Sequence, residues 1–243
     1  MTLVVTTASK RGITVVGDRA SAIEINGRVE FATATKVRYS PKARMAFAFW
    51  GKADFPQGQS YEKWAEDFVS SLEEGVSVKV ASERLAESLN EILESMGRYW
   101  YQQRRGIHVS GYQDDLPVIY HVHTGDPNAY HHRLMAYPDV PDIQFGDLGT
   151  YRRHLETGRY VQLRNGFYEL FAAFADNIYE NRDELTQMLK STFPAPSLRG
   201  QATLDETVVR MVNGLMRAAE LPERVGVEID VIAFDQHGLV DVA

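Results

Sequence analysis

The sequence of 243 residues contains no cysteine. This absence excludes a disulfide framework, a thiol nucleophile and a metal site with cysteine ligands. No apolar run approaches the roughly 18 residues that a membrane-spanning helix needs. The opening Met1-Thr2-Leu3-Val4-Val5-Thr6-Thr7 has neither a basic region nor a small-residue cleavage site, so we expect no secretory signal. These absences predict a cytoplasmic protein with no membrane contact.

Positive charge is also scarce, because 33 acidic residues outnumber 26 basic ones and give a formal net charge of −7. Basic pairs such as Arg104-Arg105 and Arg152-Arg153 stand alone in the sequence. Proteins that bind nucleic acids need a basic face, since neutralising phosphates supplies most of their affinity. We therefore expect no nucleic-acid partner.

The sequence lacks the motifs of a phosphate-binding loop, of a serine hydrolase and of a metal site. The glycine-rich stretch at 146–149 is not followed by the Lys-Ser/Thr of a phosphate loop, and no Gly-x-Ser-x-Gly motif is present. His121-Val122-His123 places two imidazoles on one face of a strand, and His131-His132 follow, but no carboxylate stands at a ligand spacing. We interpret these as surface or loop histidines and expect neither a metal nor a cofactor.

The apolar periodicity predicts strands, a helical pair, more strands, a second helical pair and final strands. The Asn26-Gly27 dipeptide favours a tight hairpin, and Thr203 with Glu206 predicts a capping box for the last helix. The predicted strands cover residues 3–8, 13–16, 23–31 as a hairpin, 36–39, 44–49, 106–112, 117–124, 227–234 and 239–242. The predicted helices lie around residues 64–72, 85–96, 167–178 and 208–216.

This order of elements indicates the architecture. Antiparallel strands with an apolar outer face need helices to cover that face. Two stacked antiparallel sheets between two helix layers satisfy this need for every element. No internal repeat and no low-complexity linker divides the chain. We therefore predict an α+β fold, a four-layer αββα sandwich, in a single domain over residues 1–243.

The most informative residues lie near the start of the chain. Removal of Met1 is expected before a residue as small as threonine, and it gives Thr2 a free α-amine. Such an amine has a reference pKa near 8, so it can act as a base at physiological pH. A hydroxyl nucleophile needs a base, and here one residue provides both groups. Lys36 and Asp18, at predicted strand ends, can supply a positive field and a carboxylate that orients it. Such residues are commonplace at strand ends, and spacing alone favours a surface ion pair.

A resemblance to a known family extends this interpretation. Residues 12–21, read with Thr2, resemble the opening of proteasome β subunits and of the related bacterial peptidase that partners a ring ATPase, both N-terminal-nucleophile hydrolases. The interval from Thr2 to Asp18 agrees with that family. Lys36-Val37-Arg38-Tyr39 and Gly51-Lys52-Ala53-Asp54 are similar to its lysine strand and to the opening of its first helix. Residues 109–112, 116–121, 229–233 and Gly238 are similar to its later hairpins.

The resemblance implies roles for individual residues. Thr2 Oγ attacks a carbonyl carbon while its own amine moves the proton, Lys36 supplies the positive field, and Asp18 orients Lys36. The backbone N–H of Gly51 stabilises the oxyanion. Arg19 and Ser21 lie in the turn that binds substrate, where the backbone of Ser21 aligns it as an added strand.

The chain departs from the family pattern in three places. Asp18 and Arg19 are adjacent, whereas the family has one residue between them. The family's Asp-x-x-Ser-Gly is replaced by Pro222-Glu223-Arg224-Val225-Gly226, and its Gly-Ser-Gly-Ser by Gly146-Asp147-Leu148-Gly149-Thr150, where Thr150 or Asp147 is a candidate substitute hydroxyl or carboxylate. The chain is similar in length to the ancestral β-subunit branch of the superfamily, but no motif assigns it there.

These observations favour a threonine peptidase that cleaves peptides or unfolded proteins. The resemblance implies a self-compartmentalised homo-oligomer and a possible ATPase partner. Two alternatives stay open: a small-molecule amidase or acylase of the same fold, because fold does not fix substrate, and a non-catalytic proteasome-like shell subunit.

Overall fold

The computed structural model describes residues 3–25, 28–51, 61–94, 105–124, 134–138, 148–166, 168–193, 196–220 and 225–241. The strands are β1 (Leu3–Ser9), β2 (Gly12–Asp18), β3 (Ala20–Ile25), β4 (Arg28–Thr33), β5 (Val37–Ser40), β6 (Met45–Gly51), β7 (Arg105–Gln113), β8 (Leu116–Thr124), β9 (Leu134–Pro138), β10 (Tyr160–Gly166), β11 (Ile229–Asp235) and β12 (Gly238–Leu239). The helices are α1 (Tyr61–Ser71), α2 (Val78–Glu94), α4 (Leu148–Glu156), α5 (Tyr168–Glu180), α6 (Arg182–Leu189) and α7 (Leu198–Ala218). Along the described part of the chain, no helix combines the length and the apolarity that a membrane crossing requires.

The strands form two main antiparallel sheets. The first has the order β10-β1-β2-β11-β12 and the second the order β5-β6-β7-β8-β9, while β3 and β4 form a separate two-stranded sheet. Strands β1 and β2 lie in the middle of the first sheet and are buried along their whole length. Strands buried on both faces need packed neighbours on both sides.

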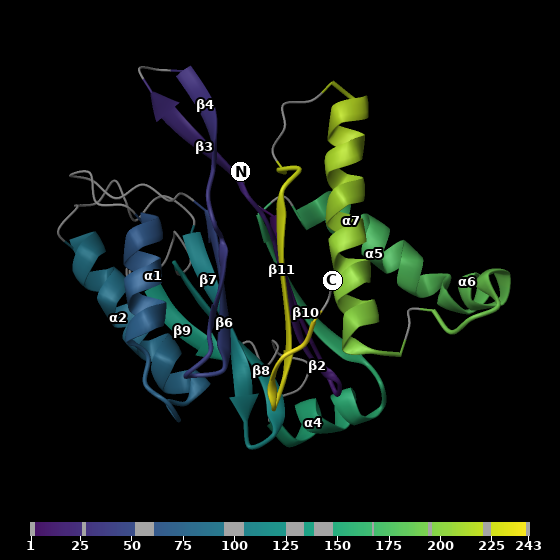
Figure 1. The fold of residues 1–243 in the computed structure, drawn as a ribbon, viewed down its shortest axis with the longest axis horizontal. Coiled ribbons are helices and arrows are strands. Elements are labelled where there is room, and N and C mark those ends of the chain that lie inside the picture. Colours follow the sequence, from purple (N-terminus) through teal and green to yellow (C-terminus); the bar gives the residue numbers. More distant parts are fainter. Residues whose placement is uncertain are drawn as a thin grey trace.

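Three apolar clusters hold the sheets and helices in four layers. One cluster packs α1 and α2 against the second sheet, and another packs α5 and α7 against the first sheet. The third cluster lies between the two sheets and includes Val4, Val15, Ala46, Ile119 and Phe234. Figure 1 shows the result, with α1 and α2 on one side of the strands and α5 and α7 on the other. The predicted four-layer αββα sandwich is confirmed.

One end of the sandwich gathers the ends of several strands. The pairing of Val4 with Gly17 brings the start of β1 beside the end of β2. The hairpin of β3 and β4 continues from β2 and projects beyond the sheets at this end (Figure 1). Its strands are joined across Ile25 and Arg28, which are paired, as the predicted two-residue turn requires.

The sequence pattern missed four elements and misplaced one helix start. It does not predict α4, α6, β9 or β10. Helix α7 begins at Leu198, and the side chain of Ser197 caps it by accepting the N–H of Gly200 at 3.0 Å. Thr203 lies inside the helix, where its hydroxyl donates to the Arg199 carbonyl. The predicted capping box at Thr203 is therefore wrong, because Ser197 already satisfies the first turn.

Candidate active site

The carboxylate of Asp18, the last residue of β2, collects donors from four segments of the chain. Its side chain is 0% exposed. Oδ1 accepts the backbone N–H of Leu3 at 2.6 Å and Nζ of Lys36 at 3.1 Å. Oδ2 accepts the backbone N–H groups of Ala20 and Gly226, both at 2.9 Å. A buried carboxylate is tolerated only with such partners, so this arrangement is a built site rather than a surface ion pair.

Lys36, just before β5, is the charged partner of Asp18. Its side chain is 6% exposed, and Nζ also donates to the carbonyl of Ala20. Burial lowers the pKa of Lys36, and the Asp18 carboxylate opposes that shift. The Lys36 carbonyl accepts the N–H of Phe49 at 2.9 Å, which ties the segment to β6. The pair therefore places a positive charge in surroundings of low polarity, where its field is strong.

The predicted nucleophile and the predicted oxyanion donor flank this pair in the chain. Thr2 lies outside the described residues, but the next residue, Leu3, is the one whose N–H Asp18 accepts. Gly51 ends β6 two residues after Phe49, is exposed, and has φ of 92°. That positive φ favours glycine at this position, where Gly51 is still paired with Arg105 of β7.

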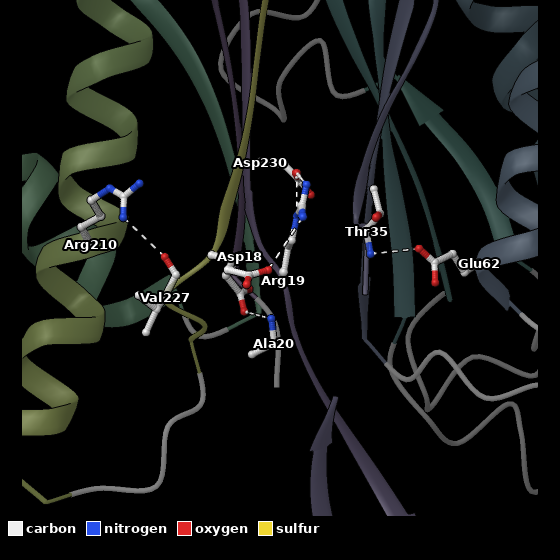
Figure 2. A network of polar contacts seen from close by, with 9 residues as sticks. Asp18, Arg19, Ala20, Thr35, Glu62, Arg210, Val227 and Asp230 are labelled. Carbon is white, nitrogen blue, oxygen red and sulfur yellow. Dashed lines mark hydrogen bonds and ion pairs between the residues drawn. The ribbon is translucent and has the colours of Figure 1, made fainter. Parts of the chain in front are cut away.

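The two residues predicted to bind substrate, Arg19 and Ser21, follow Asp18 in the chain. Ser21 is half-buried in β3 and pairs with Ala32. The guanidinium of Arg19 donates from Nε and Nη2 to Oδ1 of Asp230, at 2.8 and 2.5 Å (Figure 2). Hydrogen bonding to Asp230 raises the pKa of Arg19. The sequence pattern did not single out Asp230, whose only sequence signal is a carboxylate followed by the apolar residues 231–234 of β11.

Comparison with solved structures gives a consistent answer about the fold. A structure of Anbu (ancestral β-subunit) from Yersinia bercovieri has a TM-score of 0.55 at 12% identity, covering 96% of this chain and 81% of its own. A helical assembly of the Anbu complex from Pseudomonas aeruginosa gives 0.54 at 15% identity, with the same coverage. An Anbu (Gly-1) mutant from Hyphomicrobium sp. strain MC1 gives 0.51 at 10%, covering 99% and 85%.

The chain shares the ancestral β-subunit fold. The likeness extends over nearly the whole chain, although identities of 10 to 15% show the fold alone. No protein-family model matches the sequence, and no curated protein matches it either. The arrangement at Asp18 therefore has to be understood from its own geometry.

The segment in which the resemblance led us to look for a supporting serine reaches Asp18 through its backbone. Gly226 donates its N–H to Asp18 Oδ2, while 222–224 lie outside the described residues. Thr150 does not substitute for the second supporting hydroxyl, because α4 lies at the opposite end of the sandwich. Arg152, two residues after Thr150, donates to the carbonyl of Asp114 in the β7–β8 turn, whereas Gly51 pairs with the other end of β7. Asp147 lies outside the described residues.

His121 is not a surface group as predicted, while His131 and His132 lie outside the described residues. His121 is 8% exposed and accepts the indole N–H of Trp50 at 3.1 Å, and its ring lies 4.4 Å from that of His123. His108 is fully buried between the sheets and contacts Thr6 Oγ1 at 2.9 Å. Burial lowers the pKa of His108 well below its usual value. In the described ranges no three His, Cys, Asp or Glu residues form a group suited to a metal.

Gly226 provides a direct test of how closely the site is packed. A Cβ at this position would lie 2.8 Å from the backbone nitrogen of Ala20, so Gly226→Ala has to displace backbone. We expect it to lower the free energy of unfolding by about 1–3 kcal/mol, the usual cost of overpacking, in urea titrations. Gly214→Ala is the matched control. It lies exposed in α7 with nothing near its Cβ, so it should stabilise by up to about 1 kcal/mol.

An unchanged free energy of unfolding in Gly226→Ala, beside the expected gain in Gly214→Ala, would show that the segment gives way freely. In that case the Gly226 bond would not help to fix Asp18.

Proposed function

We propose that this protein is an N-terminal-nucleophile hydrolase that cleaves amide bonds through Thr2 after loss of Met1. One observation carries the proposal: the buried Asp18–Lys36 pair holds the N–H of Leu3. Consecutive Cα atoms are about 3.8 Å apart, so chain connectivity keeps Thr2 within one residue of that bond. A structural ion pair has no need of this position, whereas a hydroxyl nucleophile with an α-amine base does.

The reaction follows from these groups. The neutral α-amine of Thr2 takes the hydroxyl proton as Oγ attacks the carbonyl carbon of the substrate. The resulting oxyanion receives the N–H of Gly51, and such a donor typically contributes about 10²–10³ in rate. The ammonium then gives its proton to the leaving nitrogen, and the C–N bond breaks. Water, deprotonated by the same amine, then attacks the ester at Thr2. The C–O bond breaks, the ammonium returns its proton to Thr2 Oγ, and the acid is freed.

The Lys36 charge assists both proton transfers. A positive field favours the ionised hydroxyl and disfavours the protonated amine. Asp18 keeps Lys36 in place and offsets the pKa loss that burial causes. We assign these roles on geometry together with the family resemblance.

Peptides or unfolded proteins are the substrates that we propose, in a cytoplasmic homo-oligomer of single-domain chains spanning 1–243. The relative from Pseudomonas aeruginosa is described as a helical assembly, which supports an assembly of copies here. An ATPase partner belongs to the same proposal. A screen of peptides against N-acyl small molecules separates a peptidase from an amidase of the same fold.

The decisive test is the intact mass of the natively expressed chain before and after a threonine-directed peptide epoxyketone. We expect loss of Met1 and one adduct, absent in Thr2→Ala and retained in Thr2→Ser. Thr203→Ala, an exposed threonine in α7, controls for labelling elsewhere and should keep the adduct. Retained Met1 without an adduct would contradict the proposal and favour a non-catalytic shell subunit.

A further inference from the structure

Arg19 connects three elements around the candidate site. Its backbone N–H donates to the carbonyl of Glu228 at 2.9 Å, just before β11. Its own carbonyl accepts the N–H of Ala34 at 2.8 Å, two residues before Lys36. Its side chain is fixed by Asp230 in β11. One residue thus links the β2–β3 corner to β11 and to the segment that carries Lys36.

Arg19 lies between the two residues that accept hydrogen bonds from Lys36. Asp18 precedes it and Ala20 follows it, and these two residues supply the carboxylate and the carbonyl that accept Lys36 Nζ. Any shift of Arg19 therefore moves both acceptors of Lys36 together. Figure 2 shows Asp18, Arg19 and Ala20 in sequence, with Asp230 on the Arg19 guanidinium.

The Arg19 guanidinium contacts two carboxylates of the protein, those of Asp230 and Glu228. Nε and Nη2 share Oδ1 of Asp230, and Nη1 lies 3.8 Å from Oε2 of Glu228. The Asp230 side chain is 13% exposed, and its Oδ2 accepts no hydrogen bond from the residues that the structure describes. Arg19 is thus the polar partner on which this nearly buried carboxylate relies, and two carboxylates compete with any anionic group of a substrate for the guanidinium.

We propose that Arg19 and Asp230 act as one positioning unit, which holds the Asp18 carboxylate and the Ala20 carbonyl on Lys36, and that Arg19 does not contact substrate. The catalytic part of this inference rests on the proposed function, and the structural part stands without it. Asp230 is accordingly a positioning residue that acts through Arg19.

The test is a double-mutant cycle with two readouts. Arg19→Lys keeps the charge but removes the two-pronged bond, and Asp230→Asn removes the charge of its partner. In epoxyketone labelling of Thr2, both single variants should lower the maximal inactivation rate by about tenfold or more, as the loss of a charge-assisted hydrogen bond predicts, with an unchanged half-saturating concentration. The double variant should be no slower than either single variant, because the two residues act as a pair.

The second readout is amide hydrogen exchange, which does not depend on reaction at Thr2. Exchange at Arg19, Ala20 and Ala34 should accelerate by about tenfold in both single variants, because their bonds loosen together. Arg210→Lys is the matched control, since Arg210 binds Glu206 and the Val227 carbonyl without touching the Lys36 acceptors (Figure 2). It should leave labelling and exchange at those three amides unchanged.

The outcomes separate the two proposals. If Arg19→Lys raises the half-saturating concentration while Asp230→Asn changes neither labelling nor exchange, Arg19 is a substrate contact and the inference is overturned. If the wild-type chain is not labelled, the proposed function fails, and amide hydrogen exchange alone tests the positioning unit. Faster exchange in both variants then supports the positioning unit, and unchanged exchange overturns it.

Discussion

Asp18→Asn is expected to reduce epoxyketone labelling of Thr2 by at least about 100-fold and to lower the free energy of unfolding by about 3–5 kcal/mol. The stability loss follows because the buried Lys36 ammonium keeps its site but loses its counter-charge, and a broken buried pair typically costs this much. The amide of asparagine also turns an NH₂ group toward some of the N–H donors that the carboxylate accepts, which leaves buried donors unsatisfied. Urea titration and labelling rates measure the two effects.

Two comparisons make this prediction specific. Lys63 and Asp67 form an exposed pair of the same residue types in α1, so Asp67→Asn should change neither stability nor labelling measurably. Adding Lys36→Met to Asp18→Asn removes the unpaired cation. We expect the double variant to regain part of the stability while labelling stays lost. If Asp18→Asn alone keeps wild-type labelling, Lys36 is not held for catalysis.

Much of the fold was predictable where residues face the core on a regular period. Runs of β-branched residues predict strands β1 and β2, and Asn26-Gly27 predicts the hairpin of β3 and β4. The ion pair of Asp18 and Lys36 was predicted from the place of both residues at strand ends together with the family resemblance. The structure adds what spacing cannot give, namely that both side chains are buried and that Asp18 also binds backbone groups of Ala20 and Gly226.

Two of the missed elements, α6 and β10, lack an apolar period. Helix α6 has no buried residue, so no stripe marks it. Strand β10 is half-buried along its first six residues and carries polar side chains such as Gln162 and Arg164. Arg19–Asp230 was equally invisible, because their partnership depends on the pairing of β11 with β2, more than 200 positions away in the chain.

Gln162 of β10 belongs to a hydrogen-bond network around Asp205, a buried carboxylate of α7. Asp205 in α7 is 2% exposed and faces the first sheet. Its Oδ2 accepts the hydroxyls of Thr7 and Thr14 at 3.0 and 2.7 Å, and its Oδ1 accepts the amides of Gln162 and Gln201 at 3.2 and 3.0 Å. Burial raises the pKa of Asp205 to about 6, against the opposing effect of these hydrogen bonds.

This raised pKa fixes the sign of a pH dependence. Between the ordinary value of 3.8 and about 6, the folded protein binds a proton that the unfolded chain has released. Stability from Asp205 is therefore complete below pH 3.8 and is lost as the pH rises through 6. Raising the pKa of Asp205 from 3.8 to about 6 corresponds to about 3 kcal/mol of unfolding free energy.

Asp205→Asn should abolish this contribution. At position 205, asparagine keeps an acceptor and the threonine hydroxyls can rotate, so the network survives while the buried charge disappears. Relative to the variant, the wild type should lose about 3 kcal/mol of unfolding free energy between pH 4 and 6.5, measured by urea titration at equal protein concentration, since assembly also shifts apparent stability. Asp183→Asn, an exposed carboxylate on α6, should follow the wild-type curve. Parallel curves for wild type and Asp205→Asn would mean that Asp205 is charged throughout, and the packing of α7 on the first sheet would then depend on a buried anion held by its four donors.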